Sequence, residues 1–155
     1  MLDKSDFVFL YDAPSIYDGD ENIAALKKTT GTEYCVYSLF AQNVCLNQSY
    51  NKLNLANMRG CNSLKLKNVY ELYAPNLQYA KDIILPNTKN VYFSNLEYGN
   101  IYAINAHMIR IDNPDYMGIV FCNPNTNINS SANIKVRRFG NLNSALRFSK
   151  NFIIR

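Results

Sequence analysis

Few residues of this 155-residue chain combine a type and a spacing that could support catalysis. The only histidine is His107, and no C-x-x-C pair occurs among the cysteines, which are Cys35, Cys45, Cys61 and Cys122. A structural zinc site needs closely spaced pairs of such ligands, so we expect no metal and no cofactor. Cys122 and His107 could form a catalytic Cys–His pair if the fold brings them together, but no second feature of the sequence supports such a pair. The sequence contains no glycine-rich phosphate loop and no nucleophile elbow.

Carboxylate pairs hydrolyse glycosidic bonds in many enzymes, so their placement is the next test of catalytic potential. Five carboxylates lie in the middle of the chain, at Glu71, Asp82, Glu97, Asp112 and Asp115. They fall at different positions of the repeat described below, mostly in its turns, and so do not form one row. We therefore expect a protein without enzymatic activity. A carbohydrate-binding or carbohydrate-active solenoid is kept as an alternative.

Tyrosine and arginine supply the chemistry of binding rather than of catalysis, and both are enriched at the centres of protein interfaces. Tyr73, Tyr92 and Arg110 are spaced by 19 and 18 residues. They can form a row only if the chain coils with that period. The elements that position them must therefore repeat.

The repeat is marked by asparagine, of which the chain has 23, with only Asn22 in the first 40 residues. Eight of them share a context, because the residues two and four positions earlier are always apolar. Alternation of this kind predicts a short β-strand before each asparagine. Their separations are 11, 8, 11, 8, 10, 8 and 10 residues, so two successive steps add up to 18 or 19. The eight are Asn57, Asn68, Asn76, Asn87, Asn95, Asn105, Asn113 and Asn123.

This period predicts a mainly β fold, namely a small parallel β-solenoid of about four coils, each with two strands and 18–19 residues. One coil cannot bury its apolar side, whereas stacked coils build a continuous core. The paired apolar residues point inward and the residue between them points outward. Neighbouring coils lie about 4.8 Å apart, so the outward residues align in two rows. The rows are Asn54, Tyr73, Tyr92, Arg110 and Lys65, Ile84, Tyr102, Val120.

Each row fits either ordinary cross-strand pairing or a binding surface, and the sequence leaves both open. Tyr73, Tyr92 and Arg110 have the composition of a protein-binding surface. The second row contains an apolar stripe, which a cap, a partner or a second copy of the chain would cover. The predicted stripe consists of Ile84, Tyr102 and Val120.

The corners between strands show a pattern of their own. Asparagine can bond to the neighbouring coil there, and it tolerates left-handed backbone angles. Three residues after every second asparagine of the set come Gly60, Tyr79, Tyr98 and Tyr116. This spacing predicts an aromatic stack along one corner, with either a structural or a binding role.

The segments Leu72-Tyr-Ala-Pro-Asn-Leu77 and Ile84-Leu-Pro-Asn-Thr88 resemble the leucine-proline-asparagine phrases of bacterial leucine-rich repeats of the BspA type. The resemblance covers residues 52–124. It departs from that family in its shorter period, and in an asparagine that follows the last apolar residue by two positions rather than three. The contexts of Asn57, Asn76 and Asn95 are also similar to pentapeptide-repeat proteins, without the five-residue rhythm. The resemblance implies a binding scaffold, often directed at a host or competitor protein.

The two ends lack the repeat and are predicted to cap the solenoid within one structural domain. In the N-terminal cap, of α/β type, we expect strands at 7–11 and 34–41 and a helix at 20–28, where acids come first and lysines last. The predicted boundaries are 1–50 for this cap, 51–124 for the repeats and 125–155 for the C-terminal cap.

The C-terminal cap is predicted to be short and partly helical. Residues 123–132 are rich in Asn and Ser and indicate a surface loop. Residues 134–136 could pair as one more strand. Residues 143–152 then predict a short helix that covers the last coil.

Charge is unevenly divided along the chain. Residues 1–33 hold seven acids and three lysines, whereas residues 34–155 hold five acids and thirteen bases, and no acid follows Asp115. The basic end makes nucleic-acid binding a second alternative, although its bases are too dispersed for a dense basic arm. The predicted basic patch consists of Lys135, Arg137, Arg138, Arg147 and Lys150.

These observations predict a non-enzymatic protein-binding module, of the kind expected for a bacterial effector or for an inhibitor encoded by a phage or mobile element. The partner is another protein, and a homo-oligomer through a solenoid face is compatible with this. No stretch approaches the roughly 20 apolar residues of a membrane span, and the polar start of the chain does not resemble a secretory signal. We expect the protein in the cytoplasm where it is made, with delivery into a host cell as a further possibility.

Overall fold

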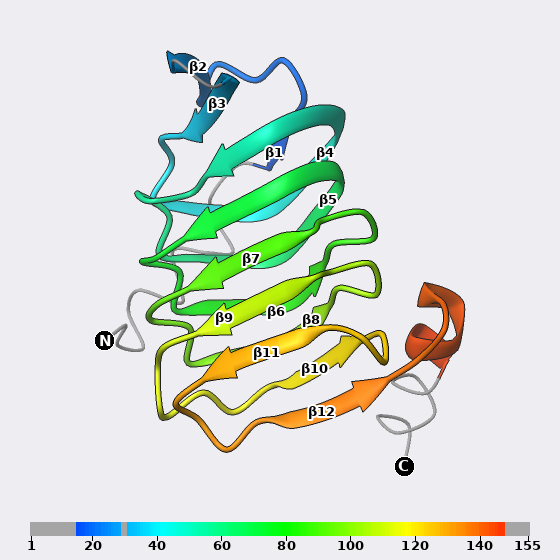
Figure 1. Ribbon diagram of the computed structural model, residues 1–155. Coiled ribbons are helices and arrows are strands. Elements are labelled where there is room, and N and C mark those ends of the chain that lie inside the picture. The colour runs from blue at the N-terminus through cyan, green and yellow to red at the C-terminus, as the bar shows by residue number, and fades with distance from the viewer. Residues whose placement is uncertain (1–14, 29–30, 148–155) are drawn as a thin grey trace.

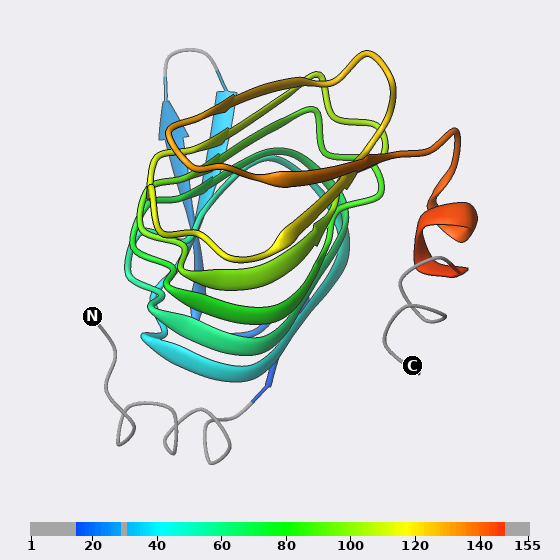
Figure 2. The ribbon, with the colours of Figure 1, turned by 90° about the horizontal axis from the view of Figure 1, so that it is seen from below.

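The computed structural model describes residues 15–28 and 31–147. They form a parallel β-solenoid of about six turns, seen from the side in Figure 1 and along its axis in Figure 2. The prediction of a mainly β solenoid is confirmed. The prediction of about four coils is wrong, because turns extend into both segments that were predicted to be caps. Within the described residues, no helix is long and apolar enough to cross a membrane.

The strands wind into two walls that face each other across the core. β4 (Phe40–Asn54) and β5 (Gly60–Ala74) bend from the first wall into the second, while later turns use two separate strands. The first wall also contains β1 (Ile16–Tyr17), β6 (Tyr79–Ile84), β8 (Tyr98–Tyr102), β10 (Ile119–Cys122) and β12 (Lys135–Arg138). The second wall also contains β3 (Gly31–Val36), β7 (Asn90–Phe93), β9 (Met108–Ile111) and β11 (Asn127–Ser130). β2 (Ile23–Lys28) pairs antiparallel with β3.

Alternation along the strands places the apolar pairs in one core between the walls. Fourteen of the sixteen residues that were predicted to point inward belong to this core and are at most 2% exposed. Phe93 is among the bulkiest of them and is fully buried. The turn formed by β4 extends the same core with Ala41, Val44 and Leu46. Burial of one continuous apolar column is what holds the stacked turns together.

The two exceptions lie on β10, where the predicted phase of the strand is reversed. Val120 lies opposite Ile101 and Phe121 lies opposite Tyr102, so Val120 points into the core and is fully buried. The strands are 19 residues apart here, whereas their asparagines are 18 apart, and a slip of one residue exchanges the two faces of a strand. The prediction that Val120 points outward is therefore wrong, and Phe121 takes its place.

The N-terminal part of the chain adds a turn of the solenoid in place of an α/β cap. The helix predicted at 20–28 is wrong, because Ile23–Lys28 forms strand β2 and pairs with every residue of β3. So short a segment is marginal as an isolated helix, and pairing with a supplied strand edge overrides its helical pattern. The strand predicted at 34–41 is interrupted between β3 and β4. The strand predicted at 7–11 lies outside the described residues.

Asp18 ties the first turn to a corner of the second. Its carboxylate accepts hydrogen bonds from the backbone N–H groups of Asn47 (2.7 Å) and Gln48 (3.2 Å) and from the hydroxyl of Tyr50 (2.8 Å). Partial burial raises the pKa of Asp18, but the three hydrogen bonds outweigh it, so the net pKa lies below its ordinary value. The pairing of β4 with β5 is irregular between Leu46 and Ser49. The Asp18 carboxylate therefore accepts hydrogen bonds from the two backbone N–H groups inside this irregularity.

We expect the free energy of unfolding to fall as the pH decreases from about 5 to 3, because the folded-state pKa of Asp18 lies below its unfolded value of about 3.9. A lowered pKa contributes stability above the unfolded value, and this stability is lost as the carboxylate becomes protonated. Asp18→Asn should therefore lower stability at pH 7 and flatten the pH dependence, as measured by urea denaturation at several pH values. Asp115→Asn, at an exposed site, is the control. A wild-type slope in Asp18→Asn would contradict this role.

Seven of the eight asparagines of the repeat link successive turns at their corners, as predicted. Asn76 Nδ2 donates to the carbonyl of Ala56 at 2.7 Å, and Asn105 Nδ2 donates to the carbonyl of Pro86 at 2.6 Å. Left-handed backbone angles have no part in this, since no described residue other than glycine has a positive φ. Bonds of the same kind are made by Asn68, Asn87, Asn95, Asn113 and Asn123.

The C-terminal residues extend the solenoid and then cover its first wall. The surface loop predicted at 123–132 is wrong where β11 pairs with β9 and Ile128 packs against the core. The strand predicted at 134–136 is confirmed as β12. The helix predicted at 143–152 occupies 142–147, and the rest of that range lies outside the described residues. This helix lies beside the solenoid rather than over its last coil (Figure 2).

Candidate binding surface

The outward side of the second wall carries a continuous ladder of aromatic and charged side chains. Tyr73, Tyr92 and Arg110 occupy one register position on β5, β7 and β9. The two tyrosine rings are stacked, with centroids 5.3 Å apart and planes 11° apart. The guanidinium of Arg110 lies 5.1 Å from the Tyr92 ring, and the ammonium of Lys52 lies 5.1 Å from the Tyr73 ring. We call Lys52, Tyr73, Tyr92 and Arg110 the Tyr–cation ladder.

Carboxylates hold both ends of this ladder. Asp112 accepts hydrogen bonds from Arg110 Nε (2.9 Å) and from the Tyr92 hydroxyl (3.0 Å). The hydrogen bond from Arg110, with a smaller contribution from Tyr92, lowers the pKa of Asp112. At the other end the nearly buried carboxylate of Glu33 lies 3.9 Å from Lys52 Nζ. The ladder is therefore pre-organised, and its side chains lose little rotamer freedom when a partner arrives.

The geometry decides which groups of the ladder a partner could touch. Each ring face is covered by the other ring or by a cation, so ring edges and the charged groups face outward. The Tyr73 hydroxyl makes no hydrogen bond within the described residues. A hollow of about 120 Å³ opens beside the two rings and is also lined by Glu71, Asn90 and Met108. This is a shallow polar and aromatic surface rather than a deep ligand pocket.

The apolar stripe predicted on the first wall is covered by the C-terminal part of the same chain. Ile84, Tyr102 and Phe121 share one register position, and the rings of Tyr102 and Phe121 are stacked with centroids 4.6 Å apart. Phe139 and the helix at 142–147 pack over them, and Ala145 of that helix is fully buried. A cap, one of the three covers considered from the sequence, therefore lies on this stripe.

The described residues of the predicted basic patch lie on β12 and on the helix at 142–147. Arg138 Nη1 donates to the backbone carbonyls of Asn123 (2.7 Å) and Thr126 (3.0 Å), so this residue supports the last corner. Lys135 and Arg137 lie on β12, and Arg147 is exposed on the helix. Lys150 lies outside the described residues.

The corner tyrosines are only partly stacked. Tyr79 and Tyr98 are stacked with centroids 5.5 Å apart, which agrees with the predicted row. Tyr116 leaves the row, because it is buried and its hydroxyl donates to the carbonyl of Gly99 at 2.6 Å. Burial raises the pKa of this hydroxyl.

No catalytic or metal-binding constellation stands out among the described residues. They contain no group of three His, Cys, Asp or Glu side chains that could hold a metal ion. Burial raises the pKa of the Cys61 thiol to about 12, and burial also raises that of Cys122. Thiols in this state are poor nucleophiles. His107 is exposed at a corner, while Cys122 is buried in the first wall.

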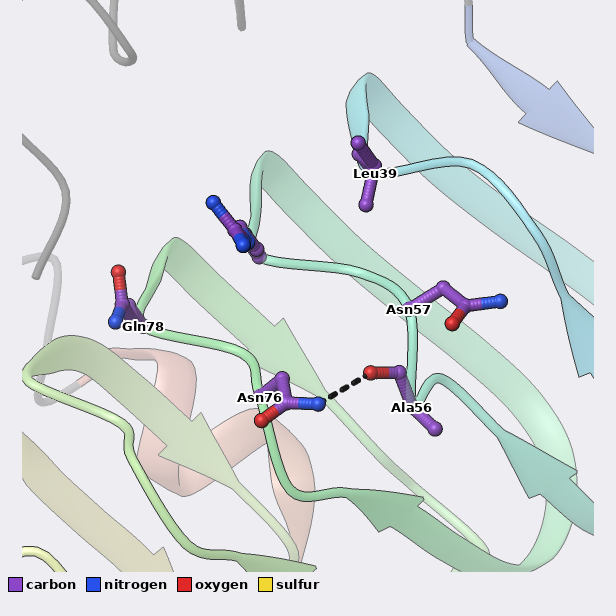
Figure 3. Close-up of a pocket in the computed structure, with 6 residues that line it drawn as sticks. Leu39, Ala56, Asn57, Asn76 and Gln78 are labelled. Atoms are coloured by element: carbon purple, nitrogen blue, oxygen red, sulfur yellow. Dashed lines mark hydrogen bonds between the residues drawn. The ribbon is translucent and has the colours of Figure 1, made fainter.

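A larger hollow of about 340 Å³, which sequence reasoning missed, lies at the corner after β4 and β5 (Figure 3). Its lining includes one guanidinium, from Arg59, and three side-chain amides. Such a lining suits a small polar ligand better than an apolar one. Arg59 and Gln78 belong to no row predicted from the strands, so only the corner geometry brings them together. The amides come from Asn57, Asn76 and Gln78.

Comparisons with known proteins add no relative. No family model matches the chain, and neither the curated proteins nor the solved structures contain a match. The likeness to BspA-type leucine-rich repeats and to pentapeptide repeats therefore gains no support beyond the solenoid arrangement itself.

Proposed function

We propose that the protein is a non-enzymatic protein-binding module whose contact surface is the Tyr–cation ladder on the second wall. The observation that carries this proposal is a pre-organised ladder of two stacked tyrosines with a cation at each end, on the wall that the C-terminal helix leaves uncovered. Tyrosine and arginine are the residue types that most often dominate binding energy at interface centres. The partner is a second protein with a flat, polar and aromatic surface.

The stacking geometry favours a protein partner over the two alternatives. Sugars and bases bind to aromatic side chains through a free ring face. The faces of Tyr73 and Tyr92 are stacked on each other and on Lys52 and Arg110, so a sugar or a base would have to break the ladder first. Ring edges, hydroxyl groups and charges suit the hydrogen bonds and van der Waals contacts of a protein interface.

The test compares two stacked tyrosine pairs of nearly the same geometry. Tyr73→Ala/Tyr92→Ala removes the ladder, and Tyr79→Ala/Tyr98→Ala removes the corner stack as a matched control. Each variant is used for affinity capture from the organism that encodes the chain, with quantitative mass spectrometry. Loss of two interface tyrosines at about 2 kcal/mol each should deplete the captured partner at least about tenfold.

The control pair should leave capture of the same partner unchanged, and both variants should retain the cooperative unfolding of the wild-type protein. Full capture by a folded ladder variant would defeat the assignment of this wall. Equal loss in both variants would also contradict it, because the effect would then be one of general destabilisation.

A further inference from the structure

The last turn of the solenoid ends in a strand whose outer edge has no partner within the described residues. β11 pairs only with β9, and the Asn127 N–H donates to the His107 carbonyl at 2.9 Å. In a parallel strand the N–H and C=O of one residue point to the same side, and successive residues alternate. Asn127 and Asn129 therefore bond to β9, while the N–H and C=O groups of Ile128 and Ser130 point to the free edge.

β12 is the last strand of the opposite wall, and its free edge is protected against further strand pairing, whereas that of β11 is not. β12 carries three bases in four residues, and the Val136 carbonyl accepts a hydrogen bond from Arg137 Nη1 at 3.2 Å. Charged side chains on an edge strand are a common defence against further strand pairing. β11, with the sequence Asn-Ile-Asn-Ser, has no charge and no proline. Its free backbone groups are therefore available to another strand.

Apolar side chains at the same end of the solenoid would be buried by such pairing, which would stabilise it. Ile128, Ala132, Ile134 and Val136 pack against the core but are only partly buried, because no further turn follows them among the described residues. The helix at 142–147 lies beside the first wall and leaves this end uncovered (Figure 2). A strand added to β11 would place every second side chain over this apolar end.

Charge decides which strand fits. No acid follows Asp115, while Lys135, Arg137 and Arg138 are exposed on the last turn. Arg138 Nη1 donates to the carbonyl of Thr126, the residue before β11, at 3.0 Å, so this guanidinium lies at the start of β11. Its positive charge attracts an acidic segment bound along that edge. We propose that the free edge of β11 accepts an extended segment of a partner protein in which apolar and acidic residues alternate, by β-strand addition.

The probe is a fluorescent eight-residue peptide that alternates valine with aspartate, and its counterpart with lysine in place of aspartate is the control. Fluorescence anisotropy at low ionic strength should show saturable binding of the aspartate peptide only. Ile128→Pro removes an edge donor but no bond to β9, so it should abolish binding. Folded Arg138→Gln should weaken binding at least about fivefold. Equal binding of both peptides, or full binding by folded Ile128→Pro, would overturn the proposal.

Amide hydrogen exchange keeps the test decisive if Ile128→Pro does not fold. In the free wild-type protein the amides of Ile128 and Ser130 should exchange fast and that of Asn129 slowly. Saturating aspartate peptide should protect the first two, and unchanged exchange would overturn the proposal. Tyr73→Ala/Tyr92→Ala should bind the peptide normally, which separates this site from the proposed function. A stable oligomer that Ile128→Pro dissociates would assign the edge to a second copy of the chain and would also overturn the proposal.

Discussion

Replacing Phe93 by alanine is expected to lower the free energy of unfolding by about 3–5 kcal/mol. Phe93 is fully buried on β7, where it lies between Ala74 and Ile111 of the adjacent turns. Backbone hydrogen bonds fix the spacing of the turns, so they cannot close on the cavity that the ring leaves. Proteins of this size have a total stability of about 5–15 kcal/mol, which makes this loss a large fraction of the whole. Urea denaturation followed by circular dichroism measures it.

The adjacent residue of the same strand is the matched control. Tyr92 is a ring of similar size that points outward and is partly exposed. Tyr92→Ala should cost less than about 2 kcal/mol, since it loses one stacking contact, one cation–π contact and one hydrogen bond but leaves no cavity. Equal losses for the two variants would contradict the alternation of the strand, on which the assignment of both walls depends.

The alternation before each asparagine was sufficient to predict the core, because a strand with two apolar residues on one side has only one favourable orientation. Leu72 and Ala74, for example, could be placed inward from the sequence, and Tyr73 between them outward. The asparagine itself was also interpreted correctly as a link between turns. Its local backbone angles were not, since hydrogen bonding to the preceding turn is enough to explain its presence.

Turns outside the regular repeat do not follow from the asparagine pattern, because they lack its context. The turn formed by β4 repeats the core pattern of the next one, since Ala41, Val44 and Leu46 pair with Cys61, Leu64 and Leu66 of β5. Apolar residues at positions two, five and seven of both strands are the signal that could have found it. Its corner differs, because an irregularity after Leu46 replaces the usual asparagine context, and Asp18 serves the amides there.

Only some residues of the Tyr–cation ladder could be predicted from the sequence. Tyr73, Tyr92 and Arg110 follow from the period alone. Lys52 lies in a different row, opposite Glu71, and joins the ladder only through the reach of its long side chain. Asp112 lies two residues after Arg110, beyond the end of the strand, so a rule based on strand alternation had no reason to include it. Strand alternation alone does not predict contacts that long side chains make across rows.

The stripe on the first wall differs from its prediction in one residue and in having an identified cover. The sequence left that cover open between a cap, a partner and a second copy of the chain. The register of β10 differs from the predicted one by one residue, so Phe121 rather than Val120 completes the stripe. The Phe121 ring stacks between those of Tyr102 and Phe139. Tyr102, Ile104, Phe121 and Ala145 form a cluster of their own, separate from the core of the solenoid. The cover can therefore be removed without dismantling the turns.

Ala145→Arg is expected to detach the helix at 142–147 from the first wall and to raise the fluorescence of bound 1-anilinonaphthalene-8-sulfonate several-fold. Ala145 is fully buried against Tyr102 and Phe121, and a guanidinium cannot stay there without a partner for its charge. The exposed rings would provide the apolar surface that the dye binds. Because the cluster is separate from the core, the urea midpoint of the solenoid should change little.

Arg147→Ala, at an exposed position of the same helix, is the control and should bind the dye as the wild-type protein does. Light scattering on the same samples tests the consequence of exposure, since an uncovered apolar stripe on a β wall favours association between copies of the chain. We expect the average mass of Ala145→Arg to rise with concentration and that of the control to match the wild-type protein. Wild-type dye fluorescence and mass in Ala145→Arg would show that the helix does not cover the stripe in solution, and the first wall would then have to be reconsidered as a contact surface beside the Tyr–cation ladder.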